Sequence, residues 1–443
     1  MHLMQRLRHL YNERQSLLWV TPAINSVLAV VLALAAAWLP RMFPQLNLPD
    51  IERDTLSSLL TVIASSMLAV TTFSLSIMVA AFAAAANGAT PRATELLMGD
   101  EGTRTAIAAF LSAFIFAVVA QIALGLGYYG NNGRFVLFVG TVAMLAWLIV
   151  TLVRWVRTLS QLGRFSNTLA RIEDAALAAC RDHASAPWLG ARRGPAQTPD
   201  GTRVLARHIG YLRRIDLPAL QDLAETAGVT IHLRVRPGQF VGPGQLLAVI
   251  QPGSQAAADT PCEPGDVAAA LLIGQNRSFE QDPRFGLIVL SEVGQRAMSA
   301  AINDPGSAIA AITSMARVLL SVDAVEEDAQ PRHPHLSLVD LDEQALVHDG
   351  FEPIARDGAG NLEMAIRLQK LLALIASQSR HAALATAARD QADRAASRHR
   401  QALAHAMDVE AFEQARQQAW AHVPAHNAQG PGKSRGLVVN HPA

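Results

Sequence analysis

Long apolar runs alternate with short polar loops in the first third of the chain, a pattern typical of membrane-spanning helices. The longest run, residues 56–86, contains no charged residue. At roughly 1.5 Å of rise per residue it would reach ~46 Å, more than the ~30 Å hydrocarbon core of a bilayer. Similar runs predict spans at 20–39, 105–126 and 135–153. The sequence therefore predicts an N-terminal α-helical transmembrane bundle of four spans within residues 1–157.

The polar residues of the run 56–86 follow the helical period. Steps of three, four, seven and four place them on one narrow stripe, which makes them candidate pore-lining residues. They are Ser58, Thr61, Ser65, Thr72 and Ser76. The stripe fits two interpretations, because hydroxyl groups let neighbouring helices approach and hydrogen-bond, and they also suit the wall of an aqueous path. In the second case we expect Ser65 and Thr72 to face water in an oligomer and Leu68 and Val79 to be less accessible there.

The chain after Arg157 has the pattern of a water-exposed, cytoplasmic α+β part. It divides by composition and periodicity into a helical stalk with a linker, a small β-rich unit, a helical unit, a small sheet followed by C-terminal helices, and a disordered tail. The expected bounds are 158–201, 202–260, 261–322, 323–423 and 424–443.

Particular elements are expected within these parts. One helix is predicted over 264–273 and another over 285–302. Strands are predicted within 336–354, and two helices within 361–422, the last capped by Asp408.

The run VRPGQFVGPGQLLAVI resembles part of the barrel-sandwich fold shared by biotinyl and lipoyl carriers and by membrane-fusion adaptors. A carrier needs a lysine in its hairpin, and the only lysines of the chain are Lys370 and Lys433. The resemblance therefore implies a small barrel that packs or binds, without a covalently attached cofactor, and we expect no cofactor at all.

A second polar row lies in the helical unit, where Glu292, Arg296, Ser299 and Asn303 are spaced by four, three and four residues. Asn303-Asp304-Pro305 predicts a helix start, with Asn or Asp as the cap and proline in the first turn. Such a row could transfer protons, but it also suits a salt-bridged helix cap, which we favour. The candidate functional or structural cluster comprises Arg277, Gln281, Asp282, Glu292, Arg296, Ser299, Asn303 and Asp304.

Three stretches together resemble a bacterial family of predicted membrane proteins of unknown function, DUF2254. They are NGATPRATELLMGD after the second span, RPGQF, and NRSFEQDPRFGLIVLSEVGQRAMSAAINDPGSA. The residues that fit the family motif are Arg277, Gln281, Asp282, Phe285, Gly286, Arg296, Ala297, Ser299, Ile302, Asn303, Asp304 and Pro305. The resemblance covers most of the chain and implies its architecture, but it brings no established activity.

Composition limits the classes of function. The chain is 51% hydrophobic and 17% charged, with a formal net charge of zero, so no overall basic surface invites nucleic acid. The two cysteines, Cys180 and Cys262, lack metal-ligand spacing, and no histidine has ligand spacing with partners. No P-loop, GxSxG, HExxH or dinucleotide motif is present. We therefore expect no metal site and no enzyme.

Three hypotheses for function remain, in order of preference. The first is an oligomeric pore or transport-related protein gated by its cytoplasmic domain. The second is a membrane-anchored scaffold or sensor that binds a partner through that domain, and the third is an enzyme using the region from Asp282 to Asp304. The expected partners are the lipid bilayer and further copies of the chain; the pattern leaves open whether an ion, a solute or another protein is also bound.

We predict a multi-pass protein of the bacterial inner membrane with both termini in the cytoplasm, because basic residues mark the cytoplasmic ends of spans. Basic residues are more numerous before the first span, in the second loop and after the fourth span than in the first and third loops. The first apolar run lacks a small-residue cleavage motif, so we expect it to remain as a span.

Reporter fusions after Trp188 should therefore show cytoplasmic activity. A periplasmic signal there would overturn the assignment for the whole C-terminal part.

Overall fold

The computed structural model describes residues 20–36, 38, 49–88, 90–93, 101–159, 165–253, 261–321 and 330–424. It divides into two compact units, Met1–Arg171 and Ile172–Ala443. Two expectations fall outside the described residues. They are the basic segment before the first span and the tail after 424.

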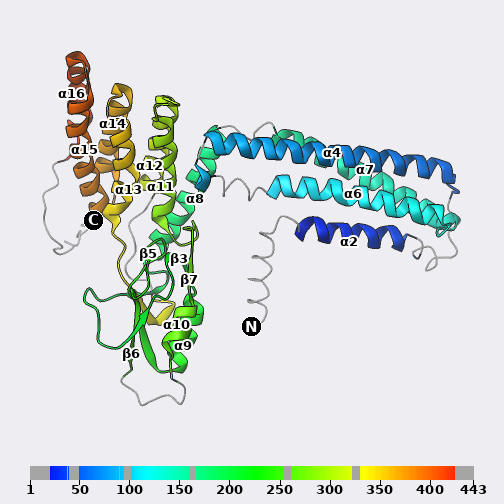
Figure 1. Cartoon of the computed structure of the whole chain (residues 1–443), viewed down its shortest axis with the longest axis horizontal. Coiled ribbons are helices and arrows are strands. Elements are labelled where there is room, and N and C mark those ends of the chain that lie inside the picture. The colour runs from blue at the N-terminus through cyan, green and yellow to red at the C-terminus, as the bar shows by residue number, and fades with distance from the viewer. Residues whose placement is uncertain are drawn as a thin grey trace, which may run out of the picture. The chain divides into compact units, whose positions relative to one another are not determined.

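The first unit is a set of apolar helices lying side by side (Figure 1). They are α2 (Val20–Ala35), α4 (Arg53–Gly88), α6 (Glu101–Gly125) and α7 (Asn131–Leu159). Helix α6 packs against the other three. At one end, Arg53 Nη2 donates to the carbonyl of Gly125 at 2.7 Å, and the Tyr129 hydroxyl donates to the carbonyl of Ala33 at 2.7 Å. These bonds satisfy carbonyl groups at helix ends, where the helical ladder leaves them open.

Three of these helices, α4, α6 and α7, are long and apolar enough to cross a bilayer. Helix α2 is equally apolar but has 16 residues, which at roughly 1.5 Å per residue is about 24 Å, less than the ~30 Å hydrocarbon core. The first of the four predicted spans therefore stays a prediction.

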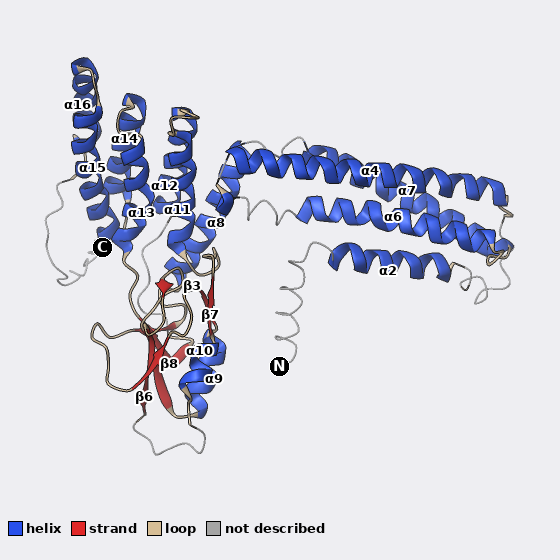
Figure 2. Cartoon of the chain, in the orientation of Figure 1, coloured by secondary structure: helices blue, strands red, loops and turns tan. Residues whose placement is uncertain are grey.

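The second unit contains two sheets and a group of helices (Figure 2). The larger sheet has the strand order β1-β8-β4-β6-β2 and the smaller one β5-β3-β7. In the larger sheet β8 pairs in parallel with both β1 and β4, and the other pairs are antiparallel. The strand bounds are β1 Ala191–Arg193, β2 Thr202–Leu205, β3 Gly210–Ile215, β4 Val229–Leu233, β5 Phe240–Val241, β6 Leu246–Pro252, β7 Leu271–Gly274 and β8 His333–Leu338.

The buried face of the larger sheet follows the alternation of its strands. Ile231 and Leu233 of β4 are buried together with Leu336 and Leu338 of β8, which lie opposite them in register. Helix α9 (Leu217–Thr226) packs on β4 and β8, and α10 (Pro264–Ala269) packs on β2 and β6. Two layers therefore enclose one apolar core.

The remaining helices are α8 (Phe165–Ser185), α11 (Pro283–Ala297), α12 (Pro305–Leu320), α13 (Glu343–Asp357), α14 (Leu362–Gln378), α15 (Ala382–Ala402) and α16 (Ala406–Trp420). Four of them begin at a side chain that accepts a bond from the first turn, which fixes where each helix starts. These caps are Asp282, Asp304, Asp342 and Asn361.

Several expected elements differ from the structure. The predicted helix 264–273 ends at Ala269 and continues as β7, and the strands predicted at 345–354 are part of α13. Three helices, not two, occupy 361–422, and α16 begins at His405 without a side-chain cap, so Asp408 lies in its first turn. The β-rich unit is not contiguous, because β8 lies inside its larger sheet.

We predict that Gly286→Ala destabilises the second unit by roughly 1–3 kcal/mol, the usual range for an overpacked core. A Cβ at Gly286 would lie 2.4 Å from the Cβ of Ala176 in α8, so the two helices would have to separate. Thermal unfolding of the purified protein measures the change. Gly265→Ala is the control, since its nearest neighbour is 4.0 Å away. Equal melting temperatures of the two variants would contradict the close approach of α8 and α11.

Candidate functional site

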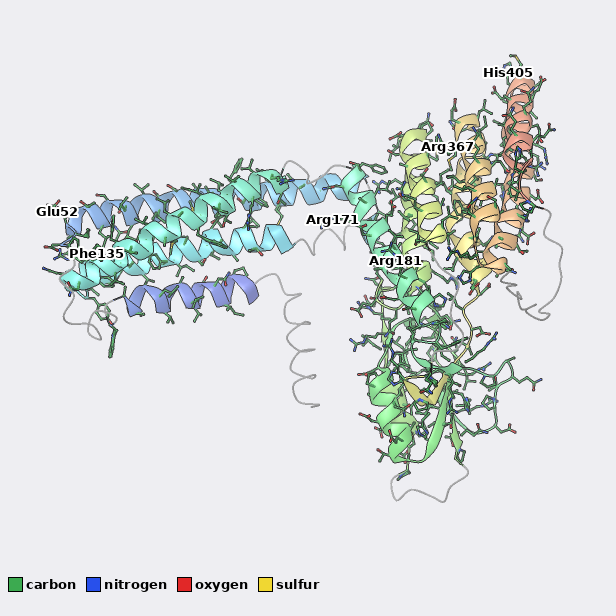
Figure 3. All side chains as sticks on the ribbon, turned by 180° about the vertical axis from the view of Figure 1, so that it is seen from behind. Glu52, Phe135, Arg171, Arg181, Arg367 and His405 are labelled. Atoms are coloured by element: carbon green, nitrogen blue, oxygen red, sulfur yellow. The ribbon has the colours of Figure 1, made fainter. Side chains whose placement is uncertain are left out.

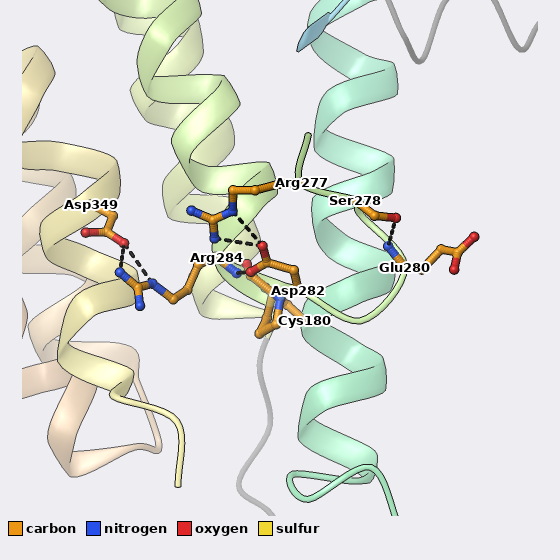
Figure 4. A network of polar contacts seen from close by, with 8 residues as sticks. Cys180, Arg277, Ser278, Glu280, Asp282, Arg284 and Asp349 are labelled. Carbon is orange, nitrogen blue, oxygen red and sulfur yellow. Dashed lines mark hydrogen bonds and ion pairs between the residues drawn. The ribbon is translucent and has the colours of Figure 1, made fainter. Parts of the chain in front are cut away.

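The motif residues around Asp282 form a buried polar cluster at the start of α11 (Figure 4). Asp282 is 1% exposed. Its Oδ2 accepts from Arg277 Nε at 2.8 Å and Nη2 at 2.7 Å, and its Oδ1 accepts from the Arg284 amide at 3.1 Å. Burial raises the pKa of Asp282, and the positive charge of Arg277 opposes that rise. The cluster therefore combines a helix cap with a buried ion pair.

The RPGQF segment closes over this carboxylate. Gly238 has φ +89° and approaches so closely that a Cβ would lie 2.1 Å from Asp282 Oδ2. Only glycine suits both the positive φ and the lack of room for a Cβ. Arg236, two residues earlier, donates to the carbonyls of Val339 at 2.7 Å and Pro187 at 2.6 Å, and burial lowers the pKa of its guanidinium to about 10. Two stretches that the sequence singled out separately thus meet here.

Gln281 and Arg284 extend the cluster to other elements. The Gln281 side chain accepts from the Ile215 amide at 2.9 Å and donates to the Ile215 carbonyl at 3.3 Å, in effect continuing β3. Arg284 Nε donates to Asp349 of α13 at 2.8 Å. The cluster therefore connects the smaller sheet, α11 and α13, and its geometry is that of a junction between elements.

The four-residue polar row is not on one helix. Glu292 and Arg296 lie in α11, which ends at Ala297, whereas Ser299 and Asn303 lie in the turn that follows. The Ser299 hydroxyl donates to the Arg296 carbonyl at 2.7 Å, and Asn303 has φ +48°. The single polar row predicted from the sequence does not form, because this turn reverses the chain before Asp304 begins α12.

Asp304 and Asp282 belong to separate places. Asp304 Oδ1 accepts from the Ser307 amide at 3.1 Å, and Oδ2 accepts from the Ser307 hydroxyl at 2.6 Å. These bonds lower the pKa of Asp304. The 15 residues of α11 separate the two carboxylates by about 22 Å at roughly 1.5 Å per residue, so they do not face one reacting atom.

The hydroxyl stripe of α4 is exposed on the protomer. The helix packs through Leu56, Leu60, Ile63 and Met67, which lie on the opposite face. All five stripe residues, Ser58, Thr61, Ser65, Thr72 and Ser76, are exposed. Leu68 and Val79, expected to be less accessible in an oligomer, lie on the same face of α4 and are 50% and 59% exposed on the protomer, so that expectation stays a prediction.

Four of the stripe hydroxyls donate to the carbonyl four residues earlier in α4. The distances are 2.8 Å for Thr61, 2.9 Å for Ser65, 2.9 Å for Thr72 and 3.0 Å for Ser76. Thr61 Oγ1 also accepts from Gln121 Nε2 of α6 at 2.9 Å. The hydroxyl protons are thus satisfied within the helix, and the oxygen lone pairs face outward to accept further bonds.

A cleft of 770 Å³ lies in the second unit, and sequence analysis did not predict it. One wall holds Trp188, Arg193 and Asp340, and the other holds the first turns of α13 and α15. Trp188 Nε1 donates to Asp340 Oδ1 at 2.9 Å, and Arg193 Nη2 donates to Oδ2 at 2.8 Å. Burial alone would raise the pKa of Asp340, but these two hydrogen bonds bring it below its ordinary value.

No local pattern pointed to this cleft, because its walls come from segments far apart in the chain: 152 residues separate Trp188 from Asp340, and 147 separate Arg193 from it. Trp188 and Arg193 meet Asp340 only through the parallel pairing of β1 with β8. The one available signal was the short run Asp340-Leu-Asp after a strand, which places acids at its carboxyl end.

Comparison with known proteins fits the resemblance found in the motifs. A family described as predicted membrane protein (DUF2254) matches residues 15–374. The chain belongs to this family. An uncharacterized protein of Mycobacterium bovis and one of Mycobacterium tuberculosis are each 31% identical over 139 residues, which is 31% of this chain and 27% of each relative. No solved structure matches the chain.

These relatives are described only as uncharacterized proteins, and the chain aligns with about a quarter of their length. Membership of this family identifies the chain as a predicted membrane protein of unknown function. Any more specific role has to come from the residues themselves.

We predict that Asp304→Ala lowers the stability of the second unit by about 1 kcal/mol, because the first turn of α12 loses its acceptor. Asp304→Asn and Asp304→Ser should largely preserve stability, since both still accept the Ser307 amide. Thermal melts of the three variants provide the comparison. Unchanged melting of Asp304→Ala would contradict the capping role.

Proposed function

We propose that this DUF2254 protein is a homo-oligomeric inner-membrane protein of pore or transport type, with its termini and second unit in the cytoplasm. In this proposal the hydroxyl stripe of α4 from several copies borders a path for water or a polar solute, and the cytoplasmic unit gates it. Four spans or fewer per copy would leave little interior for a path within one protomer, so the path requires assembly.

The orientation of the stripe is the observation that carries this proposal. It lies opposite the packed face of α4, where a single copy in a bilayer would expose it to acyl chains. Acyl chains offer no donor to the outward lone pairs, whereas water or a second copy does. Gln121, bonded to Thr61, adds an amide to the same face, and an amide is costly to leave in hydrocarbon.

A sensor or scaffold role is the second candidate, and the cleft in the second unit is the observation that favours it. Its volume of 770 Å³ falls within the roughly 300–1,000 Å³ of small-molecule sites. The two roles are compatible, because a ligand in the cleft could control a path elsewhere in the same chain.

We predict that cysteines replacing Ser65 and Thr72 react with a membrane-impermeant thiol reagent in the assembled protein. Val62→Cys and Phe73→Cys are the matched controls. Each follows a stripe residue directly, so it lies about 100° around the helix, and both side chains are exposed on the protomer. The background carries Cys180→Ala and Cys262→Ser. Mass measurement of the detergent-solubilised protein gives the oligomeric state.

Labelling rates separate the interpretations of the stripe. Fast labelling of S65C and T72C with slow labelling of V62C and F73C supports a water-facing stripe. Protection of all four sites in an oligomer indicates helix packing between copies and refutes the path. A monomeric protein also refutes it.

A further inference from the structure

The smaller sheet, β5-β3-β7, has one face in the core and one face turned away from it. Its inner face contributes four side chains to the apolar core of the second unit: Leu212, Ile215, Val241 and Leu271. Side chains alternate between the two faces of a strand, so the residues next to these point the other way. We call this side the outer face, and it comprises Ile209, Tyr211, Arg213, Arg214, Phe240 and Leu272.

Four side chains of the outer face are apolar or aromatic. Ile209, which directly precedes β3, is 69% exposed, Phe240 is 55% exposed and Leu272 is 50% exposed. The ring of Tyr211 makes a T-shaped contact with that of Phe240, its partner in register, with 5.4 Å between the ring centroids. Single exposed apolar residues are common on proteins, but several gathered on one face indicate an interaction surface.

The outer face also carries two arginines and no acid. Arg214 lies opposite Leu272 in register. The stem of Arg213 crosses Gly274, where a Cβ would lie 2.6 Å from Arg213 Cδ. Neither guanidinium has a hydrogen bond or ion pair within the part of the chain that the structure describes. The three strands contain no acidic residue, and Asp216, which follows β3, caps α9. The outer face is therefore both apolar and positively charged.

We propose that the outer face docks on the surface of a bilayer that contains anionic lipids, with its apolar side chains in the headgroup layer and its two arginines on lipid phosphates. Anionic lipids attract basic groups close to the surface, and apolar side chains gain by entering the interface. Arginine suits this position, because its apolar stem packs along the sheet while its planar guanidinium binds phosphate.

The chemistry of the outer face favours lipid over other partners. Membership of a membrane-protein family makes a bilayer available to this chain at all times. Single-stranded nucleic acid also binds arginine and aromatic side chains, but it stacks its bases on open ring faces. Ile209 and Leu272 have no ring, and in the Tyr211–Phe240 pair the edge of one ring covers a face of the other.

This inference goes beyond the pore and sensor roles and depends on neither. It concerns the outer face only, whereas the proposed path involves the stripe of α4 and the sensor role involves the cleft. The experiment measures contact with lipid, without transport and without a ligand in the cleft. Failure of the docking proposal therefore leaves the other two proposals as they stand.

The test uses the full-length protein with Cys180→Ala and Cys262→Ser, reconstituted into vesicles. Leu272→Cys carries an environment-sensitive fluorophore, and the vesicles contain a lipid with a nitroxide quencher on its headgroup. One set of vesicles is made of phosphatidylcholine, and the other is an equimolar mixture of phosphatidylcholine and phosphatidylglycerol. We expect lipid quenching of the fluorophore in the mixed vesicles and weaker quenching in the neutral ones, because the anionic lipid attracts Arg213 and Arg214.

A matched control site lies on the helices of the same unit. Leu374 of α14 is a leucine of similar exposure, 43%, and Leu374→Cys takes the same fluorophore. Arg367, on the same helix, lies apart from the two sheets (Figure 3). We expect the fluorophore at Leu374 to show little quenching in either set of vesicles. This comparison of two sites needs no change in β3, so it holds even if substitutions there impair folding.

A second pair of variants tests the charge. Arg213→Gln with Arg214→Gln removes two positive charges from the outer face. The docking constant, obtained from the quenched fraction at L272C in the mixed vesicles, should fall about tenfold, because each basic residue near an anionic surface strengthens binding several-fold. Arg367→Gln with Arg394→Gln removes two exposed charges from α14 and α15 and should change the constant by less than about twofold, because those charges lie off the outer face.

Each outcome decides the proposal. Quenching at L272C that exceeds quenching at L374C, requires phosphatidylglycerol and falls only in R213Q/R214Q supports it. Absence of quenching at L272C overturns it, as does equal quenching at L374C, equal quenching in neutral vesicles, or an equal loss in R367Q/R394Q. A fluorophore at L272C that responds to single-stranded RNA or to a higher protein-to-lipid ratio, and not to the quencher lipid, also overturns it and assigns the outer face to nucleic acid or to a second copy.

Discussion

The second unit depends on one buried carboxylate, that of Asp282. It begins α11, neutralises Arg277 and lies directly under the backbone of Gly238. Removing one partner of a buried ion pair typically costs about 3–5 kcal/mol, because the remaining charge stays buried and unpaired. The same contact fixes the RPGQF turn, from which Arg236 reaches two carbonyl groups on other segments. The sheets and the helices thus meet around Asp282, and the side chains of Gln281 and Arg284 add polar contacts to β3 and α13.

In the first unit the governing constraint is the bilayer, which tolerates no unsatisfied polar group. Helix α4 meets it locally along the stripe, since four stripe hydroxyls bond to carbonyls of the preceding turn, whereas the buried Ser74 hydroxyl has no hydrogen-bond partner among the described residues. The helix can therefore cross hydrocarbon while keeping a polar stripe. Its outward lone pairs are then available to whatever surrounds the stripe.

Sequence patterns predicted the elements whose causes are local. The apolar runs gave α4, α6 and α7, and Asn303-Asp304-Pro305 gave the start of α12, because hydropathy and capping depend on neighbouring residues. The segment 345–354 was misassigned, since a buried helix and a short strand look alike over a few apolar residues.

That Asp282 would meet Gly238 could not be predicted, although both had been singled out. The cleft shows the same limit, because Trp188 and Arg193 gain a shared partner only when β1 pairs with β8, and such a distant pairing leaves no periodic trace in either segment.

The position of β8 also sets an order of events during synthesis. The larger sheet cannot close until residue 338 has left the ribosome, by which time α11 and α12 are already available to form. Until then β4 has an unpaired edge, and such an edge invites pairing with other chains. The nascent protein thus passes through a stage in which α11 and α12 can form but β4 still has an unpaired edge. At that stage we expect chaperones to be needed to prevent pairing of this edge with other chains.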